Sequence, residues 1–564
     1  MLRYYFSETF NIYYMKKIYL FLFTIVLSIG SVFSQKTNEI YFNPNAAPTG
    51  PVRNIAEWEP TEAVMVAYYG GFGISNTVLK DIASVAKLII VCPSSNQSSV
   101  SSTMNSLGIS NYTFITSTTD SWWTRDYSAW CIADGNNTVG LVDFPYNRNR
   151  PNDDIVPGKQ ATLLGISSYL MNLTHTGGNY MCDGYGIGAS TTLVKTENPS
   201  MTVSQINTMV KSYLGLDEYI LYADAQGDYI SHIDCWAKFL APDKILVDSV
   251  PSSDPRWSEY ESAATYFKNK TCPYGYKYKV TRVLIGGSGS SPVRPYSNSL
   301  ICNNRVFVPI AGGSNATADT ACLRAYRKAM PGYIVKGYLP GAAWLNTDAL
   351  HCRTHEVADR GMVYIQHYPL YGEINSYSGY DVTAKVLSYA KKNIATGYPK
   401  VVYKVDNGTW DSIPMTLTST YNYKATIPVQ NNGSMVYYYI TAKDVDGKRA
   451  NHPYIGSPDP YPFKAIGTYV NVNELTVAPS FTFFPMPNPA TSKDLISLSV
   501  NCEKAESATV KIYSITGSVM HEENLELNAG INVNPINSKE LASGIYYVTI
   551  QTASSVLTKQ LVIQ

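Results

Sequence analysis

The chain has 564 residues, which is too long for a single hydrophobic core and predicts roughly two to four domains. Hydrophobic residues make up 45% of the chain and charged residues 15%, and this balance excludes a largely disordered protein. The formal net charge is +1. Without a strong positive charge or a basic run, the sequence gives no reason to expect a nucleic-acid partner.

The first residues have the pattern of an export signal. Positive charge at Met15-Lys16-Lys17 precedes an apolar stretch from Ile18 to Gly30, and small residues follow before Gln35. We therefore predict a signal peptide over residues 1–34, with residues 1–14 arising from a mis-assigned start, and a lead segment over 35–49. The apolar stretch is too short for a typical membrane span.

A strand–helix–strand pattern repeats five times over a predicted catalytic domain at residues 50–368. Thr202 and Gln205 have the spacing of a capping box, and Gly215 ends that helix. Asp254 is expected to cap the fourth helix, with Pro255 in its first turn. The predicted units are 64–69, 77–86 and 88–92; 140–144 and 160–170; 192–195, 202–214 and 219–223; 244–250, 255–268 and 277–284; and 305–310, 320–330 and 333–338.

Two regions that contain only strand patterns follow. Residues 369–470 alternate apolar and polar positions between turns such as Asp406-Asn407-Gly408, which predicts an immunoglobulin-like β-sandwich. A linker is expected over 471–483. Residues 484–564 are again all strand and predict a second β-sandwich.

A short polar motif precedes the first strand of each following unit, at a spacing of roughly 50–65 residues, which is typical of propeller-like repeats. If the units surround one axis, the motifs converge on one pocket. They are Trp122-Trp123-Thr124-Arg125-Asp126, Thr176-Gly177-Gly178-Asn179, Ser231-His232-Ile233-Asp234-Cys235-Trp236, Ser297-Asn298-Ser299 and Asp348-Ala349-Leu350-His351-Cys352.

The sharpest chemical feature is Cys352 in His351-Cys352-Arg353-Thr354-His355. The nine cysteines of the chain form no CxxC pairs, so their spacing suits neither a disulfide framework nor a zinc ribbon. Flanking cations favour a reactive thiolate at Cys352. A buried cysteine beside surface charges remains an equal alternative on this motif alone.

Three further residues add acid–base and cation-binding groups. His232 and Asp234, two positions apart on an expected strand, would face the same side and suit proton transfer, or form a structural pair or half a metal site. Asp126 lies among indoles, where a flat cation would bind; a surface pair with Arg125 is the alternative. Two carboxylates in one pocket match a planar guanidinium, which Cys352 would attack.

A metal site and an anion site are further alternatives. His232, Asp234, His351 and His355 could in principle bind zinc, but no HExxH or CxxC motif supports this, and we expect no metal. Arg148 and Arg150 could grip a substrate carboxylate in bidentate fashion. Their alternative is a solvated loop in which Asp153 and Asp154 neutralise them.

These strings resemble the Porphyromonas-type peptidylarginine deiminases of the guanidino-modifying (pentein) superfamily. The resemblance rests on SWWTRDYSAW, GLVDFPYNRNRPNDD, TGGNYMCDGYG, GDYISHIDCWAK, YSNSLICNNRVFVP and NTDALHCRTHEVAD. It implies an α/β fold, a five-fold pseudosymmetric αβ propeller, and deimination of peptidyl-arginine, preferably C-terminal, to citrulline and ammonia through a covalent cysteine intermediate. It implies no cofactor and no calcium requirement. A monomer is expected.

By matching motif, the resemblance also implies roles for individual residues. Cys352 would be the nucleophile, His232 the acid and base, and Asn298 a supporting active-site residue. Further substrate-binding residues are implied to be the carboxylates Asp126 and Asp234, the carboxylate readers Arg148 and Arg150, and the pocket walls Trp123 and Tyr229.

The last region resembles the C-terminal sorting domain of type IX secretion, through FPMPNPA, VKIYSITG, LASGIYYV and TKQLVI. This implies an interaction with that secretion machinery and a protein that is secreted or attached to the outer-membrane surface. Two other functions stay open: an agmatine deiminase-like hydrolase of small guanidino compounds, and a catalytically dead surface-binding protein or adhesin.

Overall fold

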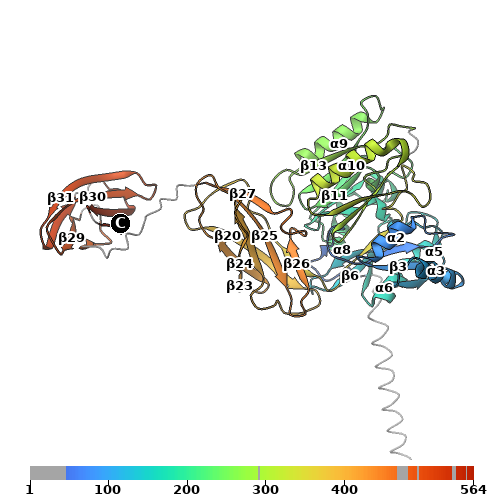
Figure 1. Ribbon diagram of the computed structural model, residues 1–564, viewed down its shortest axis with the longest axis horizontal. Coiled ribbons are helices and arrows are strands. Elements are labelled where there is room, and N and C mark those ends of the chain that lie inside the picture. The colour runs from blue at the N-terminus through green and yellow to red at the C-terminus, as the bar shows by residue number, and fades with distance from the viewer. Residues whose placement is uncertain (1–45, 290–292, 467–480, 492–493, 537–540, 554) are drawn as a thin grey trace, which may run out of the picture. The chain divides into compact units, whose positions relative to one another are not determined.

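The computed structural model describes residues 46–289, 293–466, 481–491, 494–536, 541–553 and 555–564 (Figure 1). The predicted signal peptide, most of the lead segment and most of the linker lie outside these residues. The chain divides into two compact units, Met1–Tyr469 and Val470–Gln564. Within the described residues, no helix is both long and apolar enough to cross a membrane.

Five mixed sheets between residues 53 and 358 share one strand pattern. Each contains three neighbouring strands of which the outer two pair with the middle one, one antiparallel and the other parallel. The orders are β17(His355–Ala358)-β2(Thr61–Ala67)-β3(Lys87–Cys92)-β4(Tyr112–Thr116); β1(Arg53–Asn54)-β5(Trp130–Ala133)-β6(Val139–Asp143)-β7(Ser168–Leu170); β8(Met181–Cys182)-β9(Ile187–Thr191)-β10(Glu218–Tyr222); β11(Ala237–Ala241)-β12(Lys244–Ser249)-β13(Lys279–Leu284); and β14(Leu300–Cys302)-β15(Arg305–Pro309)-β16(Ile334–Tyr338). Strands β1 and β4 each extend one of the five sheets at an edge.

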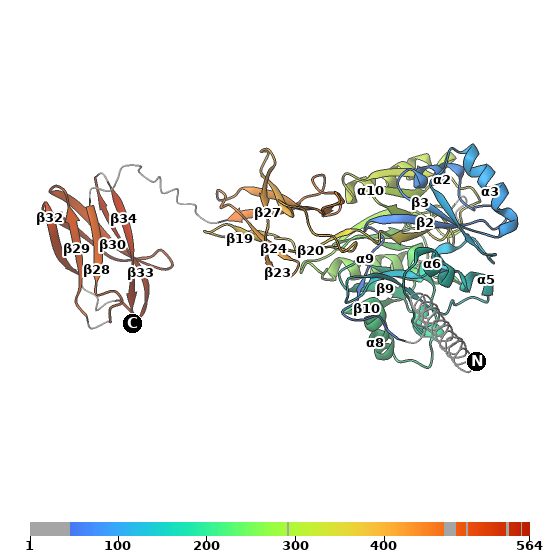
Figure 2. The same ribbon diagram turned by 90° about the horizontal axis from the view of Figure 1, so that it is seen from below.

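Helices join the parallel strands and cover the sheets, as α9 and α10 do beside β13 and α8 does beside β10 (Figures 1 and 2). They are α2(Asn76–Ala83), α3(Ser94–Ser106), α6(Val156–Leu164), α8(Val203–Leu214), α9(Trp257–Asn269) and α10(Ala316–Ala329). Shorter turns of helix are α4(Thr124–Tyr127), α5(Pro151–Asp154), α7(Leu193–Glu197), η1(Gly177–Asn179), η2(Ile233–Cys235) and η3(Gly313–Asn315).

The predicted mixed α/β fold is confirmed, and the five repeated units are recognisable. Strand β17, from the end of this region, joins the sheet of β2 from its beginning, as units arranged around one axis require. Closure of the ring and its five-fold symmetry stay predictions.

Most predicted helices and strands of the five units are confirmed to within a few residues, and α8 begins at the predicted capping box of Thr202 and Gln205. The prediction for the third unit is partly wrong. Residues 193–197 form helix α7, and the strand lies earlier, at β9. Gly188 makes this strand hard to recognise in the sequence. Packing requires a glycine there, because a Cβ atom at this position would lie 2.6 Å from Cδ1 of Leu216.

Two other predicted helix boundaries are also wrong. Helix α6 ends at Gly165, whose φ of 65° is left-handed, and the last predicted helical residues form strand β7. Helix α9 begins at Trp257 after an N-cap at Arg256. Asp254, its predicted cap, instead accepts hydrogen bonds from the backbone N–H and side chain of Arg256.

Two further sheets between residues 363 and 466 enclose one hydrophobic core, with Val382 and Val436 on facing sheets. One is β18(Val363–Gln366)-β20(Tyr380–Ser388)-β24(Asn422–Ile427)-β23(Thr416–Ser419); the other is β19(Glu373–Asn375)-β27(Tyr461–Ile466)-β25(Met435–Lys443)-β21(Lys400–Val405)-β22(Asp411–Pro414), with β26(Arg449–His452) beside β25. The immunoglobulin-like assignment stays a prediction. Strand β18 pairs with β20 although it precedes the predicted boundary at 368.

The C-terminal unit also consists of two sheets around a core of its own, which includes Phe483, Val510 and Val548. The sheets are β28(Phe481–Met486)-β29(Ile496–Cys502)-β32(Gly530–Ile536) and β31(Val519–Leu527)-β30(Glu506–Ser514)-β33(Gly544–Thr552)-β34(Val556–Ile563).

Candidate active site

The five polar motifs occupy equivalent places in the five sheets. Each lies in the segment that leaves the outer parallel strand of one unit and enters the first strand of the next: before β5, β8, β11, β14 and β17. These segments meet. The backbone N–H of Arg125 donates to the carbonyl of Cys352 at 3.2 Å, and Asn179 Oδ1 accepts from the backbone N–H of Ile233 at 3.3 Å.

Gly178 marks the centre of the site. A Cβ atom on this residue would lie 2.6 Å from Nδ1 of His232, 2.8 Å from Oδ1 of Asp126 and 3.3 Å from Oδ2 of Asp234. Side chains from different units therefore surround the same small space, and any side chain at position 178 would fill it. Asp126, His232 and Asp234 are all buried.

Cys352 contacts Asp234, which borders this space, and Asn298. Its Sγ lies 3.8 Å from Oδ2 of Asp234, and the Nδ2 group of Asn298 donates to that sulfur at 3.2 Å and to the same carboxylate oxygen at 3.1 Å. Oδ1 of Asn298 accepts the backbone N–H groups of His351 and Cys352 at 3.0 and 3.2 Å. Because the amide oxygen is held by two donors, its NH₂ group must face the thiol and the carboxylate.

The predicted cationic field around Cys352 is wrong. Burial, followed by the charges of Asp234 and Asp126, raises the pKa of the thiol well above its usual value. Arg353 turns away: it donates to both carboxylate oxygens of Asp348 and to the carbonyl of Gly73. Without a cationic ligand, Cys352 is therefore a thiol.

His351 bridges two carboxylates. Its Nδ1 lies 2.7 Å from Oδ2 of Asp234, and its Nε2 lies 2.9 Å from Oε2 of Glu57, which also accepts from Lys238 at 2.6 Å. Burial alone would raise the pKa values of both carboxylates, but Lys238 and His351 hold that of Glu57 well below its usual value, and His351 lowers that of Asp234. Because an ionised carboxylate only accepts hydrogen bonds, Nδ1 of His351 donates its proton to Asp234.

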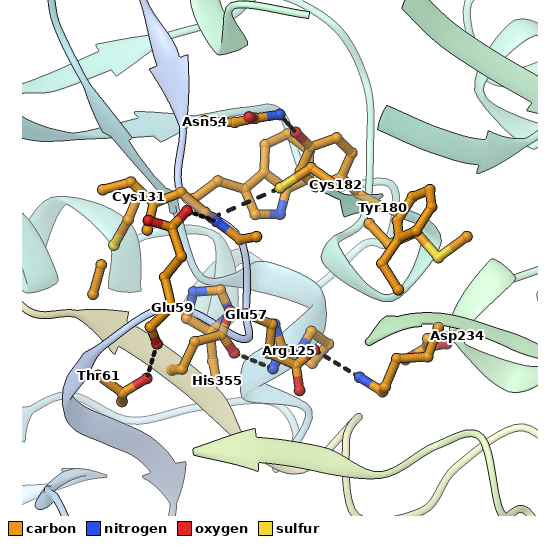
Figure 3. A pocket seen from close by; sticks show the side chains of 18 of the residues that line it. Asn54, Glu57, Glu59, Thr61, Arg125, Cys131, Tyr180, Cys182, Asp234 and His355 are labelled. Carbon is orange, nitrogen blue, oxygen red and sulfur yellow. Dashed lines mark hydrogen bonds and ion pairs between the residues drawn. The ribbon is translucent and has the colours of Figure 1, made fainter. Parts of the chain in front are cut away.

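Glu57 was missed by the sequence reasoning. Its signal was a carboxylate between the apolar Ala56 and Trp58, where a buried charge needs partners. Figure 3 shows Glu57 with Arg125 and Asp234 around a cavity of about 50 Å³. Asp234 lines this cavity and also borders the space around Gly178, whereas Cys352, His232 and Asp126 do not line the cavity.

His232 and Asp126 face each other without a hydrogen bond: Nδ1 of His232 lies 3.8 Å from Oδ1 of Asp126. Among the described residues, neither ring nitrogen of His232 nor Oδ1 of Asp126 has a hydrogen-bond partner, although all three atoms are buried. Burial lowers the pKa of His232 to about 4. Burial and the charge of Asp234 raise the pKa of Asp126 well above its usual value. Buried polar groups are normally hydrogen-bonded to protein, water or ligand, so these three atoms are available to a polar ligand.

The relation between His232 and Asp234 differs from the prediction. Both side chains border the space at Gly178. The reason is not the alternation of side chains along a strand, because Ile233–Cys235 is a 3₁₀ turn. The carboxylate of Asp234 holds His351 and not His232. The alternative pair of Arg125 with Asp126 is wrong as well, because Arg125 pairs with Glu356.

Arg148 and Arg150 lie beside the site, and their charges act against the raised pKa of Asp126. Arg150 covers the ring of Trp123 at 4.3 Å and donates to the hydroxyl of Tyr146 at 2.9 Å. Nη1 of Arg148 lies 4.0 Å from Oε1 of Glu197, and the side chain of Arg148 is about one third exposed. The alternative in which Asp153 and Asp154 neutralise both arginines is wrong.

Asp153 instead accepts from the backbone N–H groups of Asp120 and Ser121, and Asp154 accepts from the backbone N–H of Tyr146.

The two predicted pocket walls differ in burial: Trp123 is half-buried, whereas Tyr229 is 85% exposed. Of the other indoles near Asp126, Trp130 lies in the core, stacked on Phe144.

The zinc arrangement considered from the sequence is not assembled. His355 directs its Nε2 to the carbonyl of Ala129 at 3.1 Å. Across the described ranges, no three His, Cys, Asp or Glu side chains are grouped so as to hold a metal ion. All nine cysteines are buried and free of disulfides.

Comparison with known families gives two matches. Residues 53–357 match the model of the Porphyromonas-type peptidyl-arginine deiminases. Residues 486–564 match that of the secretion system C-terminal sorting domain. A sorting domain of this kind indicates a protein that is secreted or attached to the outer-membrane surface, and it implies contact with the secretion machinery.

Individual relatives are more distant. A putative agmatine deiminase of Vibrio parahaemolyticus is 24% identical over 263 residues, covering 41% of this chain and 68% of the relative. The agmatine deiminase of Medicago truncatula is 26% identical over 237 residues, covering 36% and 62%. The X-ray structure of a putative agmatine deiminase aligns with a TM-score of 0.50 at 19% identity, covering 56% of this chain and 99% of that one, which shows a common fold.

Proposed function

The chain belongs to the Porphyromonas-type peptidyl-arginine deiminase family of guanidino-group hydrolases, and we propose that it converts C-terminal arginine residues of peptides to citrulline and ammonia. One observation carries the proposal: His232, Asp126 and Asp234 surround the space beside Gly178, and the thiol of Cys352 adjoins it through Asp234. A nucleophile, a proton carrier and two anions in one buried space suit a planar cation with a central electrophilic carbon.

In the first step the guanidinium binds between Asp126 and Asp234. Its N–H groups supply the donors that the unpartnered Oδ1 of Asp126 lacks. The arriving positive charge favours the anionic forms of Asp126 and of Cys352, whose pKa values burial and neighbouring carboxylates raise. The substrate therefore supplies the cation that the protein does not place beside its thiol.

In the second step Cys352 transfers its proton to His232, which burial keeps neutral by lowering its pKa to about 4. Sγ then forms a bond to Cζ of the substrate. His232 returns the proton to one terminal nitrogen, the Cζ–N bond breaks, and ammonia leaves. A covalent thiouronium group remains on Cys352.

In the third step water attacks Cζ while His232 accepts a proton from it. The C–S bond then breaks, the proton on His232 restores the thiol, and the second proton of the water passes to the released ammonia, which leaves neutral citrulline and ammonium. Asn298 supports both covalent steps, since its NH₂ group donates to Sγ and to Asp234 and so stabilises the sulfur whenever it is anionic. Thiol and imidazole supply the nucleophile and the acid, so we propose that neither a cofactor nor calcium takes part.

Arg148 and Arg150 are proposed to bind the α-carboxylate of a C-terminal arginine. The positive charges of both arginines act to lower the pKa of Asp126, so both arginines lie close to the proposed guanidinium position. Trp123, covered by Arg150, and Tyr229 would line the approach to it. We further propose that the protein acts as a monomer outside the cell.

A second candidate, hydrolysis of agmatine, has one observation in its favour. Glu197 lies 4.0 Å from Arg148 and accepts from Nδ2 of Asn147 at 2.8 Å. A carboxylate at this distance could receive the ammonium group of agmatine in place of a substrate carboxylate. The two arginines beside it would oppose that ammonium.

The deciding experiment measures kcat/KM for three substrates: a peptide ending in arginine, the same peptide with an amidated C-terminus, and agmatine. We expect the free carboxylate to be preferred over the amide, and both over agmatine, with and without a chelator. Faster turnover of agmatine would overturn the proposed substrate. No deiminated product from any of the three would overturn the enzymatic function and favour a binding protein.

A further inference from the structure

The outward face of the sheet that contains β21 and β25 gathers positive charge. Val401 on β21 and every second residue of β25 point into the core, so Lys400 and Lys404 point outward on β21 and Lys443 on β25. Strand register places Lys443 opposite Arg449 of β26. These four cations, Lys400, Lys404, Lys443 and Arg449, are called the cationic face.

Three of the four surround one tyrosine ring. Arg449, Lys443 and Lys400 lie 5.5, 5.1 and 5.4 Å from the ring centre of Tyr398, and Nη1 of Arg449 donates to its hydroxyl at 3.1 Å. The hydrogen bond from Arg449, with the charges of all three cations, lowers the pKa of Tyr398. Three like charges around one ring repel each other, so an anion arriving between them would relieve that repulsion.

The fourth cation lies over two other rings. Nζ of Lys404 is 5.3 Å from the ring centre of Trp410 and 5.4 Å from that of Tyr437. Trp410 meets Tyr439 edge to face at 5.4 Å. Contact with aromatic rings restricts a lysine side chain without neutralising its charge, so Lys404 is held in place and still positive.

The cationic face has no acidic counterpart. Among the described residues, no Asp or Glu oxygen lies within ion-pair distance of its four cations, whereas Lys424 and Lys464 of the same region pair with Asp381 and Glu373. Asp411 is near in sequence, but in the strand register it stands opposite Tyr403, whose side chain points away from this face.

We propose that the cationic face binds a linear acidic polysaccharide. Lys400 and Lys404 are four residues apart on one strand, about 13 Å at the usual rise per residue, so the face offers two anion positions along a line, as a repeating charged chain requires. Cations already cover the faces of the Tyr398 and Tyr437 rings, so the stacking of bases that single-stranded nucleic acids use is not favoured. The sorting domain directs the protein to the outside of the cell, where charged polysaccharides are met.

The test measures binding of the full chain to dextran sulfate, to neutral dextran and to a single-stranded DNA oligonucleotide. We expect dextran sulfate alone to bind well, and high salt to weaken it. The triple variant K400A/K443A/R449A should bind about tenfold more weakly, since each exposed charge contact contributes modestly. K404A alone should also lose affinity, which keeps the test valid if the triple variant does not fold.

The matched control removes the same charge elsewhere. Lys80, Lys87 and Lys268 are exposed on the catalytic domain, and K80A/K87A/K268A should bind dextran sulfate as the wild type does. Both triple variants should keep deiminase activity and the wild-type unfolding temperature. Equal losses in the two triple variants, equal binding of neutral dextran, or tighter binding of the oligonucleotide would each overturn the proposal.

Discussion

His351 donates one ring proton to Asp234, across 2.7 Å, and the carboxylate oxygen that accepts it also contacts Cys352 and Asn298. The other ring nitrogen of His351 faces Glu57 at 2.9 Å. The ionisation of Asp234, which a guanidinium requires, is thus supported by a hydrogen bond from a ring that a second carboxylate holds.

Glu57→Gln should move the acidic limb of the kcat/KM profile to higher pH. Without the carboxylate of Glu57, nothing holds Nε2 of His351, so the hydrogen bond from His351 to Asp234 weakens and the pKa of Asp234 rises. A shift of about one pH unit corresponds to ~1.4 kcal/mol. Glu59→Gln is the control, because Glu59 is buried near by but pairs with Arg53. An unshifted limb in a folded Glu57→Gln enzyme would refute this relay.

Cys352→Ala should reduce citrulline formation by roughly a thousandfold or more, because no other group can form the covalent intermediate. The far-UV spectrum should stay that of the wild type. Cys322→Ala removes another buried thiol, on helix α10, and should keep full activity. Ammonia release by the Cys352→Ala variant would exclude the proposed nucleophile.

Arg148→Ala combined with Arg150→Ala should weaken the preference for C-terminal arginine. Each charged contact to a carboxylate is worth about 1.5–3 kcal/mol, so the ratio of kcat/KM between free and amidated peptides should approach one. Agmatine turnover should change less. Arg327→Ala, far along the chain on helix α10, is the control. An unaltered ratio would show that the arginines do not read the carboxylate.

Binding of a C-terminal arginine peptide to the Cys352→Ala variant should be accompanied by proton release from Asp126. The pKa of Asp126 is raised well above its usual value in the free protein, and the guanidinium lowers it by favouring the carboxylate. Calorimetric titration in two buffers of different ionisation enthalpy, repeated at several pH values, measures the number of protons released. Asp126→Asn, added to the same variant, should abolish the release. Binding to Cys352→Ala without any proton exchange would contradict the prediction.

Stability should fall as the pH drops from about 6.5 to about 4, partly through His367. Its Nδ1 donates to the carbonyl of Thr383 and its Nε2 accepts from Tyr438, and burial lowers its pKa to about 4. The unfolded chain binds the proton at higher pH than the folded one, so acid favours unfolding, by about 3 kcal/mol for this group.

Unfolding by urea at pH 7 and pH 4.5 measures this loss, and His367→Gln should reduce the difference. The buried groups that face this ring are the hydroxyls of Tyr438 and Tyr461 and the ring of His452, whose pKa burial also lowers. His521, which is partly exposed in the C-terminal unit, gives a control in His521→Gln. An identical pH dependence in the His367→Gln variant would rule His367 out.

Local patterns predicted what local physics decides. The capping box at Thr202 and the stop at Gly215 define helix α8 because the first and last turns of a helix depend on neighbours three or four residues away. The recurrence of polar motifs likewise predicted that Asp126, His232, Asn298 and Cys352 share one site, because equivalent positions of repeated units meet.

The sequence by itself determined the types of chemical group in the site and the repeated units that carry them. Only the tertiary structure decided which groups touch: that Asp234 holds His351 and not His232, that Glu57 completes the bridge, and that Arg353 turns away from the thiol. These pairings join residues as far as 294 positions apart. No local spacing encodes them, because they depend on how separate sheets pack and on which buried charges must find partners once water is excluded.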